Sequence, residues 1–411
     1  MKKLLLLSFL FPSLVLASFS ARIVDASTQE PIKNAAINGL VLSKRSDING
    51  SFSIDTNESI LHIKAYGYRP FSFDTNTTET LFALEPIKVK ALYLTFWGAS
   101  NNSKTSKRVL EIIKATEANA VVLDVKSEYG STSFLTGFKQ ANSYGAQNNR
   151  TNRNIHKFIQ KMKENNIYTI ARIVTFKDEL QASNNPDYAL KRDNNGSIWR
   201  NHDNMAWVDP FDSRSHDYTI RIAEEAAKVG FDEINFDYIR FPAKSGLRFS
   251  KKNTQENRVK AIETFLDTAQ ARLQKYGVFI SVDTYGNILW SKKDDNNIGQ
   301  MLDSLANHAD YLAPMLYPSG FASGSFLVDY PADHPHTVIY RSLKNIKDRV
   351  DLKRVRPWLQ YFKDYKSKRR PYGKFEVQEQ VRATKELNTN GWMMWSPSSK
   401  YNKSYFSNEV E

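Results

Sequence analysis

The chain has 411 residues, with 57 lysines and arginines against 44 aspartates and glutamates, so its formal net charge is +13. Hydrophobic residues make up 41% and charged residues 25% of the chain, which is the balance of a folded protein and not of a disordered one. The length allows two or three domains, or one large barrel with an appendage. Cysteine is absent from the sequence, which excludes disulfides, thiolate nucleophiles and sulfur-ligated zinc.

The first residues have the pattern of a secretory signal peptide. Lys2 and Lys3 precede an apolar run from Leu4 to Leu16, and the small residue Ala17 suits a signal peptidase. The run is shorter than the about 20 residues that span a bilayer. We therefore expect a cleaved signal over residues 1–17 and a periplasmic or secreted protein without stable membrane insertion. A retained N-terminal anchor is the alternative.

Residues 18–87 consist of short alternating runs broken by turn residues, which predicts a small all-β sandwich. Asn49-Gly50 lies between the alternating residues of 46–54 and predicts a hairpin. With TQEPI at 28–32 and YGY at 66–68, the segment resembles the carboxypeptidase-regulatory-like modules, which have a transthyretin-like β-sandwich fold. The resemblance implies a non-catalytic module, and we expect His62 to be a half-exposed surface side chain and not a ligand.

Residues 88–411 alternate apolar, β-rich runs with longer amphipathic runs. The predicted strands are 91–97, 120–126, 168–174, 233–238, 278–283, 311–317, 356–361 and 392–395. The predicted helices between them are 106–117, 155–164, 216–228, 259–275, 298–307, 339–349 and 376–386. Such strands imply a parallel sheet that is buried on both faces. Eight of them close most naturally into a (β/α)8 TIM barrel, an α/β fold. The alternative, an open doubly wound sheet, lacks a Gly-rich phosphate turn after the first strand.

In a barrel of this kind the functional residues follow the C-terminal ends of the strands. Three acids stand at such positions, namely Asp124, Asp237 and Asp283. Because side chains alternate along a strand, Glu233 and Asn235 share the inward face with Asp237. An unpaired buried carboxylate is costly. Asp237 should therefore pair with a nearby arginine, Arg172 or Arg240, or lie in a hydrated site.

The run GFDEINFDYIRFP at 230–242 is similar to the signature of a bacterial family of TIM-barrel glycoside hydrolases. Supporting motifs are VLDVK at 122–126, IARIV at 170–174, AWVDP at 206–210, APMLYPS at 313–319 and RPWLQ at 356–360. This resemblance covers about residues 88–400. It implies hydrolysis of glycosidic bonds in a TIM barrel.

Glycoside hydrolysis requires two carboxyl groups in unlike environments, one protonated and one ionised. We expect Asp237, close to cationic arginines, to be the ionised nucleophile, and Asp283 to be the acid. Asp124 would bind a sugar hydroxyl or orient the pair, and Glu128 is an alternative acid. A chitinase-like DxxDxDxE motif is incomplete here, because Ile239 stands where its terminal glutamate would act. An arrangement with acids on strands four and five fits better.

Polar and aromatic residues at the same strand ends are candidates for substrate binding. They are Trp97, Arg172, Arg240, Tyr285, Tyr317, Gln360 and Trp395. Of the aromatic residues near these ends, Trp97, Trp207, Tyr317 and Trp395 could stack on sugar rings or simply pack in the core.

We expect neither a metal nor a cofactor. The HxH spacing of His334 and His336 lies in a predicted loop before a helix and not on the first strand. The run Asp294–Asn297 lacks the glycine and glutamate of an EF-hand, and we predict a solvated turn there. The basic segment from Lys363 to Arg370 would either steer an acidic glycan or form a solvated face. Nucleic acid is disfavoured, since the sequence contains no known binding motif.

The sequence therefore predicts a glycoside hydrolase that acts on a cell-envelope or extracellular polysaccharide, an acidic one being one interpretation of the charge. The main alternative is a non-catalytic carbohydrate-binding barrel that lacks a working acid/base pair. A scaffold for envelope assembly, in which the N-terminal sandwich contacts a partner, is a third interpretation. The sequence gives no indication of the oligomeric state.

Overall fold

The computed structural model describes residues 17–100, 103–366 and 371–407. The predicted signal peptide falls almost entirely outside these ranges. Within the described ranges, no helix combines the length and apolar character that crossing a membrane requires.

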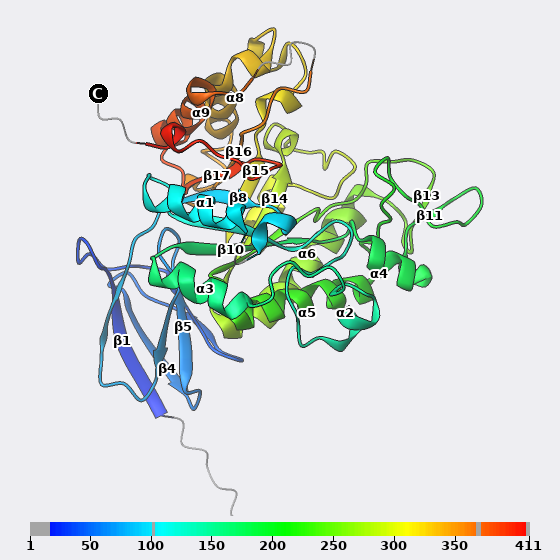
Figure 1. Cartoon of the computed structure of the whole chain (residues 1–411). Helices are drawn as coiled ribbons and strands as arrows, with labels where there is room; N and C mark the ends of the chain where they lie inside the picture. The colour runs from blue at the N-terminus through cyan, green and yellow to red at the C-terminus, as the bar shows by residue number, and fades with distance from the viewer. Residues whose placement is uncertain (1–16, 101–102, 367–370, 408–411) are drawn as a thin grey trace, which may run out of the picture.

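An N-terminal domain of two packed β-sheets comes first, as predicted (Figure 1). One sheet contains β1 (Ala17–Asp25), β4 (Ser51–Thr56) and β7 (Leu81–Leu84), and the other contains β2 (Ala36–Asn38), β3 (Ser43–Arg45), β5 (Ile60–Lys64) and β6 (Phe71–Asp74). Alternating side chains of both sheets, such as Ile23, Phe52 and Phe73, form one buried core. This alternation explains why the sequence specifies a sandwich.

The prediction of a hairpin at Asn49-Gly50 is wrong. A turn is present, because Gly50 has a φ of 75° and the Asp47 carboxylate accepts the backbone N–H of Ser51 at 2.8 Å. However, the strands on either side, β3 and β4, belong to different sheets. The turn therefore connects the two layers of the sandwich and does not pair its flanking strands.

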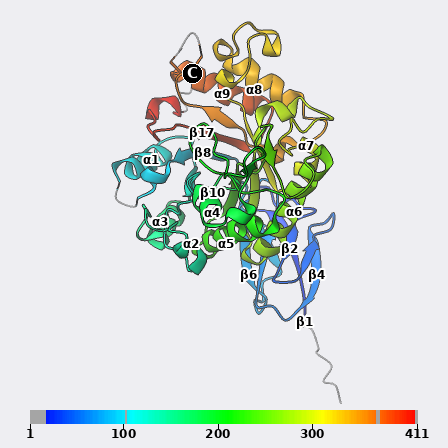
Figure 2. The ribbon, with the colours of Figure 1, turned by 90° about the vertical axis from the view of Figure 1, so that its right-hand side faces the viewer.

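Eight parallel strands then close into a barrel, as the sequence predicted (Figure 2). They are β8 (Val89–Leu94), β9 (Ala120–Lys126), β10 (Tyr168–Val174), β12 (Glu233–Asp237), β14 (Phe279–Tyr285), β15 (Tyr311–Met315), β16 (Trp358–Gln360) and β17 (Gly391–Trp395). All residues of β9 and β10 are buried. Burial on both faces accounts for their continuous apolar runs.

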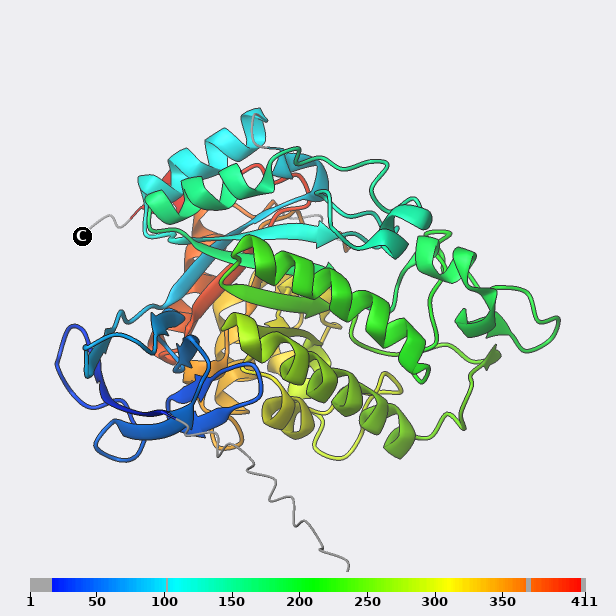
Figure 3. The same ribbon diagram turned by 90° about the horizontal axis from the view of Figure 1, so that it is seen from below.

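Helices on the outside of the barrel connect successive strands, and α5 and α6 lie side by side along it (Figure 3). The connecting helices are α1 (Lys104–Lys114), α3 (Ile155–Glu164), α5 (Ser213–Val229), α6 (Gln255–Leu273), α7 (Leu302–His308), α8 (Pro335–Lys344) and α9 (Lys374–Glu386). Short helices α2 (Lys139–Ser143) and α4 (Glu179–Asn184) and a ribbon of β11 (Lys191–Arg192) and β13 (Leu247–Arg248) lie in the loops.

Local signals explain where these helices begin and end. The side chain of Asn154 caps α3 by accepting the N–H of Lys157. Ile155, Phe158 and Ile159 then form the apolar stripe that packs on the barrel. At the end of α5, Gly230 adopts a φ of 97°, which is a left-handed conformation that stops a helix.

The N-terminal domain covers the end of the barrel at which the strands begin. Lys64 donates to the carbonyl of Val278 at 3.0 Å and forms an ion pair with Asp310 at 2.8 Å. The ring of Tyr66 packs against Tyr311. His62, predicted to be a half-exposed surface residue, is half-buried in this contact and hydrogen-bonds the carbonyl of Lys275 at 2.8 Å. In the described part of the chain, the residues that line the cavity at the opposite end all come from the barrel.

Candidate active site

The C-terminal ends of the barrel strands surround a cavity of about 310 Å³. Its walls contain two carboxyl groups from neighbouring strands, two arginines and several aromatic rings. The lining residues are Glu128, Arg172, Asp237, Tyr238, Arg240, Asp283, Tyr285, Gly286, Asn287, Met315, Tyr317, Gly320, Phe321, Trp358, Tyr365 and Trp395. This is the end of a TIM barrel at which active sites are built.

Arg172, on β10, connects acids from the two strands that flank it. Its Nη1 lies 2.6 Å from Oδ1 of Asp124 on β9, and its Nη2 and Nε lie 2.5 and 3.0 Å from Oδ2 of Asp237 on β12. Glu128, in the loop after β9, is 3.6 Å from Nη2. Burial opposes the charge of Arg172, but these acids outweigh burial and raise the pKa of its guanidinium well above its usual value. The predicted pairing of Asp237 with Arg172 is therefore present.

Asp237 has donors on both carboxylate oxygens. Besides the two N–H groups of Arg172, the backbone N–H of Tyr238 donates to Oδ1 at 2.6 Å. Tyr238 makes this contact with a left-handed φ of 49°, which is uncommon for an aromatic residue. Donors of this kind stabilise the ionised form of a carboxyl group.

Asp283, on the adjacent strand β14, has a different environment. It is 2% exposed, and its Oδ1 accepts hydrogen bonds from Nδ2 of Asn235 at 2.8 Å and from Nε1 of Trp358 at 2.7 Å. Burial, followed by the negative charge of Asp237, raises the pKa of Asp283 well above its usual value. The two carboxyl groups thus lie in different environments, one bound by a guanidinium and one buried without a cationic hydrogen-bond donor among the described residues.

Asp124 lies behind the cavity and does not line it. Tyr93 donates to its Oδ2 at 2.5 Å and Arg172 to its Oδ1, while burial raises its pKa. Asp124 does line a second cavity of about 480 Å³ on the other side of Glu128, together with Trp97 and Tyr129. Of the two roles predicted for Asp124, these contacts suit the orientation of Arg172 and Asp237 better than direct contact with a sugar in the first cavity.

The structure divides the remaining predicted binding residues into three groups. Those that line the first cavity are Arg172, Arg240, Tyr285, Tyr317 and Trp395. Trp97 lines the second cavity and is 72% exposed. Gln360 lines neither cavity, because its buried amide is held by Ser319 and by the carbonyl of Phe362. Trp207 is also buried outside the cavity, where it packs against Tyr238.

Several cavity residues were missed in the sequence. Trp358 is the most important, since its indole N–H holds Asp283. It lies two residues before Gln360 on β16, so strand alternation placed both residues on one face and could have pointed to it. Phe321 and Tyr365 come from long loops for which periodicity gives no signal.

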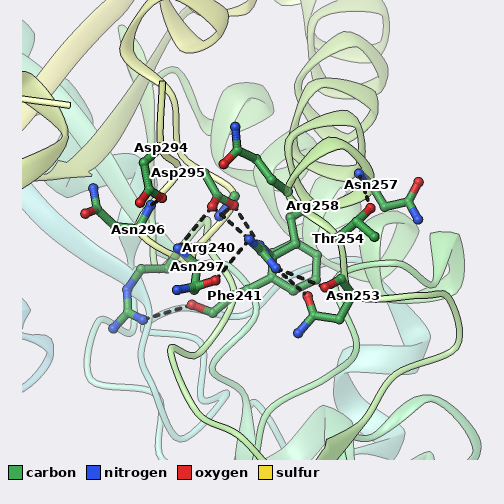
Figure 4. Close-up of polar contacts among 12 residues, drawn as sticks. Arg240, Phe241, Asn253, Thr254, Asn257, Arg258, Asp294, Asp295, Asn296 and Asn297 are labelled. Atoms are coloured by element: carbon green, nitrogen blue, oxygen red, sulfur yellow. Dashed lines mark hydrogen bonds and ion pairs between the residues drawn. The ribbon is translucent and has the colours of Figure 1, made fainter. Parts of the chain in front are cut away.

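The turn at Asp294–Asn297 was predicted to be solvated, and for Asp295 this is wrong (Figure 4). Asp295 is buried, and its two oxygens accept from Nε and Nη2 of Arg258 at 2.6 and 2.8 Å. The turn therefore anchors the loop before α7 to α6. Figure 4 also shows Arg240, whose Nη1 donates to the carbonyl of Phe241 at 3.2 Å.

Other candidate ligands are engaged elsewhere. His334 occupies the N-cap position of α8 without a side-chain capping hydrogen bond, and His336 lies in the first turn, where it pairs with Glu386 at 2.9 Å. Among the described residues, no group of three or more His, Asp or Glu side chains is arranged to hold a metal ion. Of the basic segment Lys363–Arg370, residues 367–370 lie outside the described ranges, and Lys366 donates to the carbonyl of Phe321.

Comparisons with solved structures agree with this architecture. The glycoside hydrolase domain of PgaB (BpsB) from Bordetella bronchiseptica has a TM-score of 0.58 at 12% identity, over 79% of this chain and 100% of that chain. The alpha-L-fucosidase isoenzyme 2 from Paenibacillus thiaminolyticus has a TM-score of 0.50 at 12% identity, over 78% and 48%. At these identities the likeness shows the fold alone.

A hypothetical protein from Ruminiclostridium thermocellum ATCC 27405 is 34% identical over 47% of this chain and 96% of that chain, with a TM-score of 0.41. A search of curated proteins gave no match. The family model described as "Putative glycosyl hydrolase domain" matches residues 91–401, which is more than half of the chain and includes the whole cavity. The chain therefore belongs to this family of glycosyl hydrolase domains.

Proposed function

We propose that the protein hydrolyses an O-glycosidic bond of a cell-envelope or extracellular polysaccharide, with Asp283 as general acid and Asp237 as nucleophile or base. One observation carries the proposal: two carboxyl groups on neighbouring strands face one cavity in unlike environments, Asp237 against the guanidinium of Arg172 and Asp283 in a buried position that raises its pKa. This difference is what acid-assisted cleavage of a glycosidic bond needs.

The hydrogen bonds of Asp283 suggest where its proton lies. Oδ1 accepts two N–H donors, from Asn235 and Trp358, and so acts as the carbonyl-type oxygen. The proton then belongs on Oδ2, for which the described residues supply no hydrogen-bond partner. Since Asp283 lines the cavity, Oδ2 can donate to the oxygen of the leaving sugar.

Asp237 would act on the anomeric carbon while Arg172 holds it in place. The register pairs Phe236 with Val282, so Asp237 and Asp283 follow an aligned pair on adjacent strands. Strands in a sheet lie about 4.8 Å apart, a spacing that favours the short carboxyl separation of a retaining pair, about 5–5.5 Å. Asp124 would keep Arg172 oriented from the other side.

One observation favours the non-catalytic alternative. Arg172 and the N–H of Tyr238 together occupy both oxygens of Asp237, which lowers its nucleophilicity. A barrel with this arrangement could bind a glycan without cleaving it.

Turnover of a panel of neutral and acidic envelope glycans by the wild type and by Asp237→Asn distinguishes the two functions. We expect the wild type to release reducing ends from at least one glycan, and the variant to keep its fold and lose this activity. Equal activity in both proteins would remove Asp237 from the mechanism. A glycan that binds both proteins without cleavage would favour the binding function.

The periplasmic or secreted location remains part of this proposal, and the predicted signal peptide supports it. Envelope and extracellular polysaccharides occur in those compartments.

A further inference from the structure

A third opening, distinct from the cavity that Trp97 lines, lies beside the proposed catalytic cavity. It has a volume of about 740 Å³, and it is lined by Trp290, Lys292, Gly324, Phe326, Leu327, Arg341, Lys344, Asn345, Lys347 and Asp348. The two cavities have a common wall, because Phe321 of the catalytic cavity packs edge-on against Phe326 at 4.8 Å between ring centroids. A polysaccharide chain that leaves the catalytic cavity on this side would therefore meet this opening.

The lining of this opening is strongly basic. Lys292, Arg341, Lys344 and Lys347 are all exposed, and none of the four forms an ion pair with a carboxylate within the described ranges. Asp348 is the one acid among the lining residues. Four cations without a carboxylate partner in the described part of the chain give this opening a local positive charge, which would attract an anionic ligand.

The opening is also built around aromatic and apolar side chains. Trp290 is 44% exposed and packs edge-on against Phe326 at 5.3 Å. Phe326 and Leu327 have left-handed φ values of 60° and 55°, an uncommon conformation for such residues, and Arg341 donates to the carbonyl of Phe326. On the other wall, Asn345 donates to the carbonyl of Leu289 at 2.8 Å. An exposed indole in a fixed frame suits stacking on a sugar ring.

We propose that this basic opening, centred on Lys344 and Lys347, binds a carboxylate-bearing stretch of an acidic polysaccharide next to the bond that is cleaved. This inference rests on the proposed function, and it gives the substrate a class, a polymer of uronic acid type. The concave shape and the wall shared with the catalytic cavity favour a polysaccharide chain over an anionic lipid surface, which would need a protruding apolar face.

The test measures binding by the full chain carrying Asp283→Asn, so that turnover does not interfere. The probes are polygalacturonate and its methyl ester, which differ in charge and share a backbone. We expect polygalacturonate to bind more tightly than the ester, and Lys344→Gln with Lys347→Gln to weaken its binding by about tenfold at low salt, as expected for the loss of two exposed ion pairs. Trp290→Ala should weaken binding of both probes.

The matched control is Lys157→Gln with Lys161→Gln, which removes two exposed lysines from α3 on another face of the barrel. An equal loss in this control would assign the binding to the overall charge of +13 and overturn the proposal. Equal binding of polygalacturonate and its ester would also overturn it. So would binding to phosphatidylglycerol vesicles in place of polygalacturonate. Binding as expected, with no hydrolysis of any glycan by the wild type, would instead contradict the proposed catalysis alone.

Discussion

The two ends of the barrel both bury charged side chains, and they do so differently. At the end covered by the N-terminal domain, Glu233 meets Arg356 with Oε1 and Oε2 at 2.9 and 2.8 Å from Nη1. Tyr168 also donates to Glu233, and Glu233 and Arg356 are 0% and 1% exposed. At the open end, Arg172 serves two carboxylates directly, and Asp283 lies beside them at the cavity.

The comparison shows what distinguishes a structural ion pair from a candidate active site in one and the same lumen. At the closed end one carboxylate balances one guanidinium. At the open end the acids outnumber the arginine that holds them, and burial together with the negative charge of Asp237 raises the pKa of Asp283. An excess of acid next to an open cavity is costly for stability and is useful for proton transfer.

The largest expected effect is at the open end. Asp283→Asn should lower hydrolysis by about 10²–10⁴-fold, because the variant can accept the same hydrogen bonds but cannot donate the acid proton. Initial rates on any glycan that the wild type cleaves provide the measurement. Asp193→Asn, an exposed acid in the turn directly after β11, is the control and should retain full activity. Substantial activity in Asp283→Asn would assign the acid to another group, with Glu128 the next candidate.

A substitution at the closed end should lower the stability of the fold and leave the rate of catalysis unchanged. Glu233→Gln leaves the buried Arg356 without its counter-charge, and breaking a buried pair in this way costs about 3–5 kcal/mol. Chemical denaturation should show this loss of unfolding free energy, while kcat of the folded variant stays close to that of the wild type. A fall in kcat at unchanged stability would mean that the two ends are not separate in function.

Asp283 should contribute to the dependence of stability on pH. Its pKa is raised in the folded state, so the unfolded chain releases this proton first as the pH rises above about 3.8. The stabilisation is therefore complete below that value and is lost as the pH rises through the folded pKa. Thermal unfolding across this range should show a decline in the wild type that is reduced in Asp283→Asn. Parallel curves for the two proteins would show that Asp283 is ionised in the folded state.

The smallest expected effect is at the 480 Å³ cavity on the other side of Glu128. Trp97 is exposed there and would provide a stacking surface for a distant sugar. Trp97→Ala should raise KM about three- to tenfold for long substrates, in line with the loss of about 1 kcal/mol of aromatic contact, and should leave kcat unchanged. Leu135→Ala, an exposed apolar residue that does not line this cavity, is the control. A fall in kcat would place Trp97 in the catalytic step.

Much of the fold was predictable, because the parallel strands are buried on both faces. The ranges 120–126 and 168–174 agree with β9 and β10, and 155–164 agrees with α3. The strand predicted at 91–97 instead ends at Leu94, because Thr95 caps a short 3-10 helix by accepting the N–H of Gly98. The strand predicted at 356–361 is shorter, since Pro357 has no N–H to donate to the ladder.

The site was predictable in its acids and less so in their partners. Asp237 and Asp283 follow from strand ends and alternation, which are local properties of the sequence. The contact of Trp358 with Asp283 and the burial of Asp295 against Arg258 depend on how distant segments meet. The position of Gln360 away from the cavity depends on Ser319, in a loop whose path periodicity does not specify.

The measurement that tests the central claim most directly is the infrared difference spectrum between the wild type and Asp283→Asn at neutral pH. The claim is that this barrel holds a neutral carboxylic acid beside an ionised one. We expect the wild type to show a carbonyl band of a protonated carboxyl group that is missing in the variant. A difference spectrum with carboxylate bands alone would contradict the account, because Asp283 would then have no proton to give.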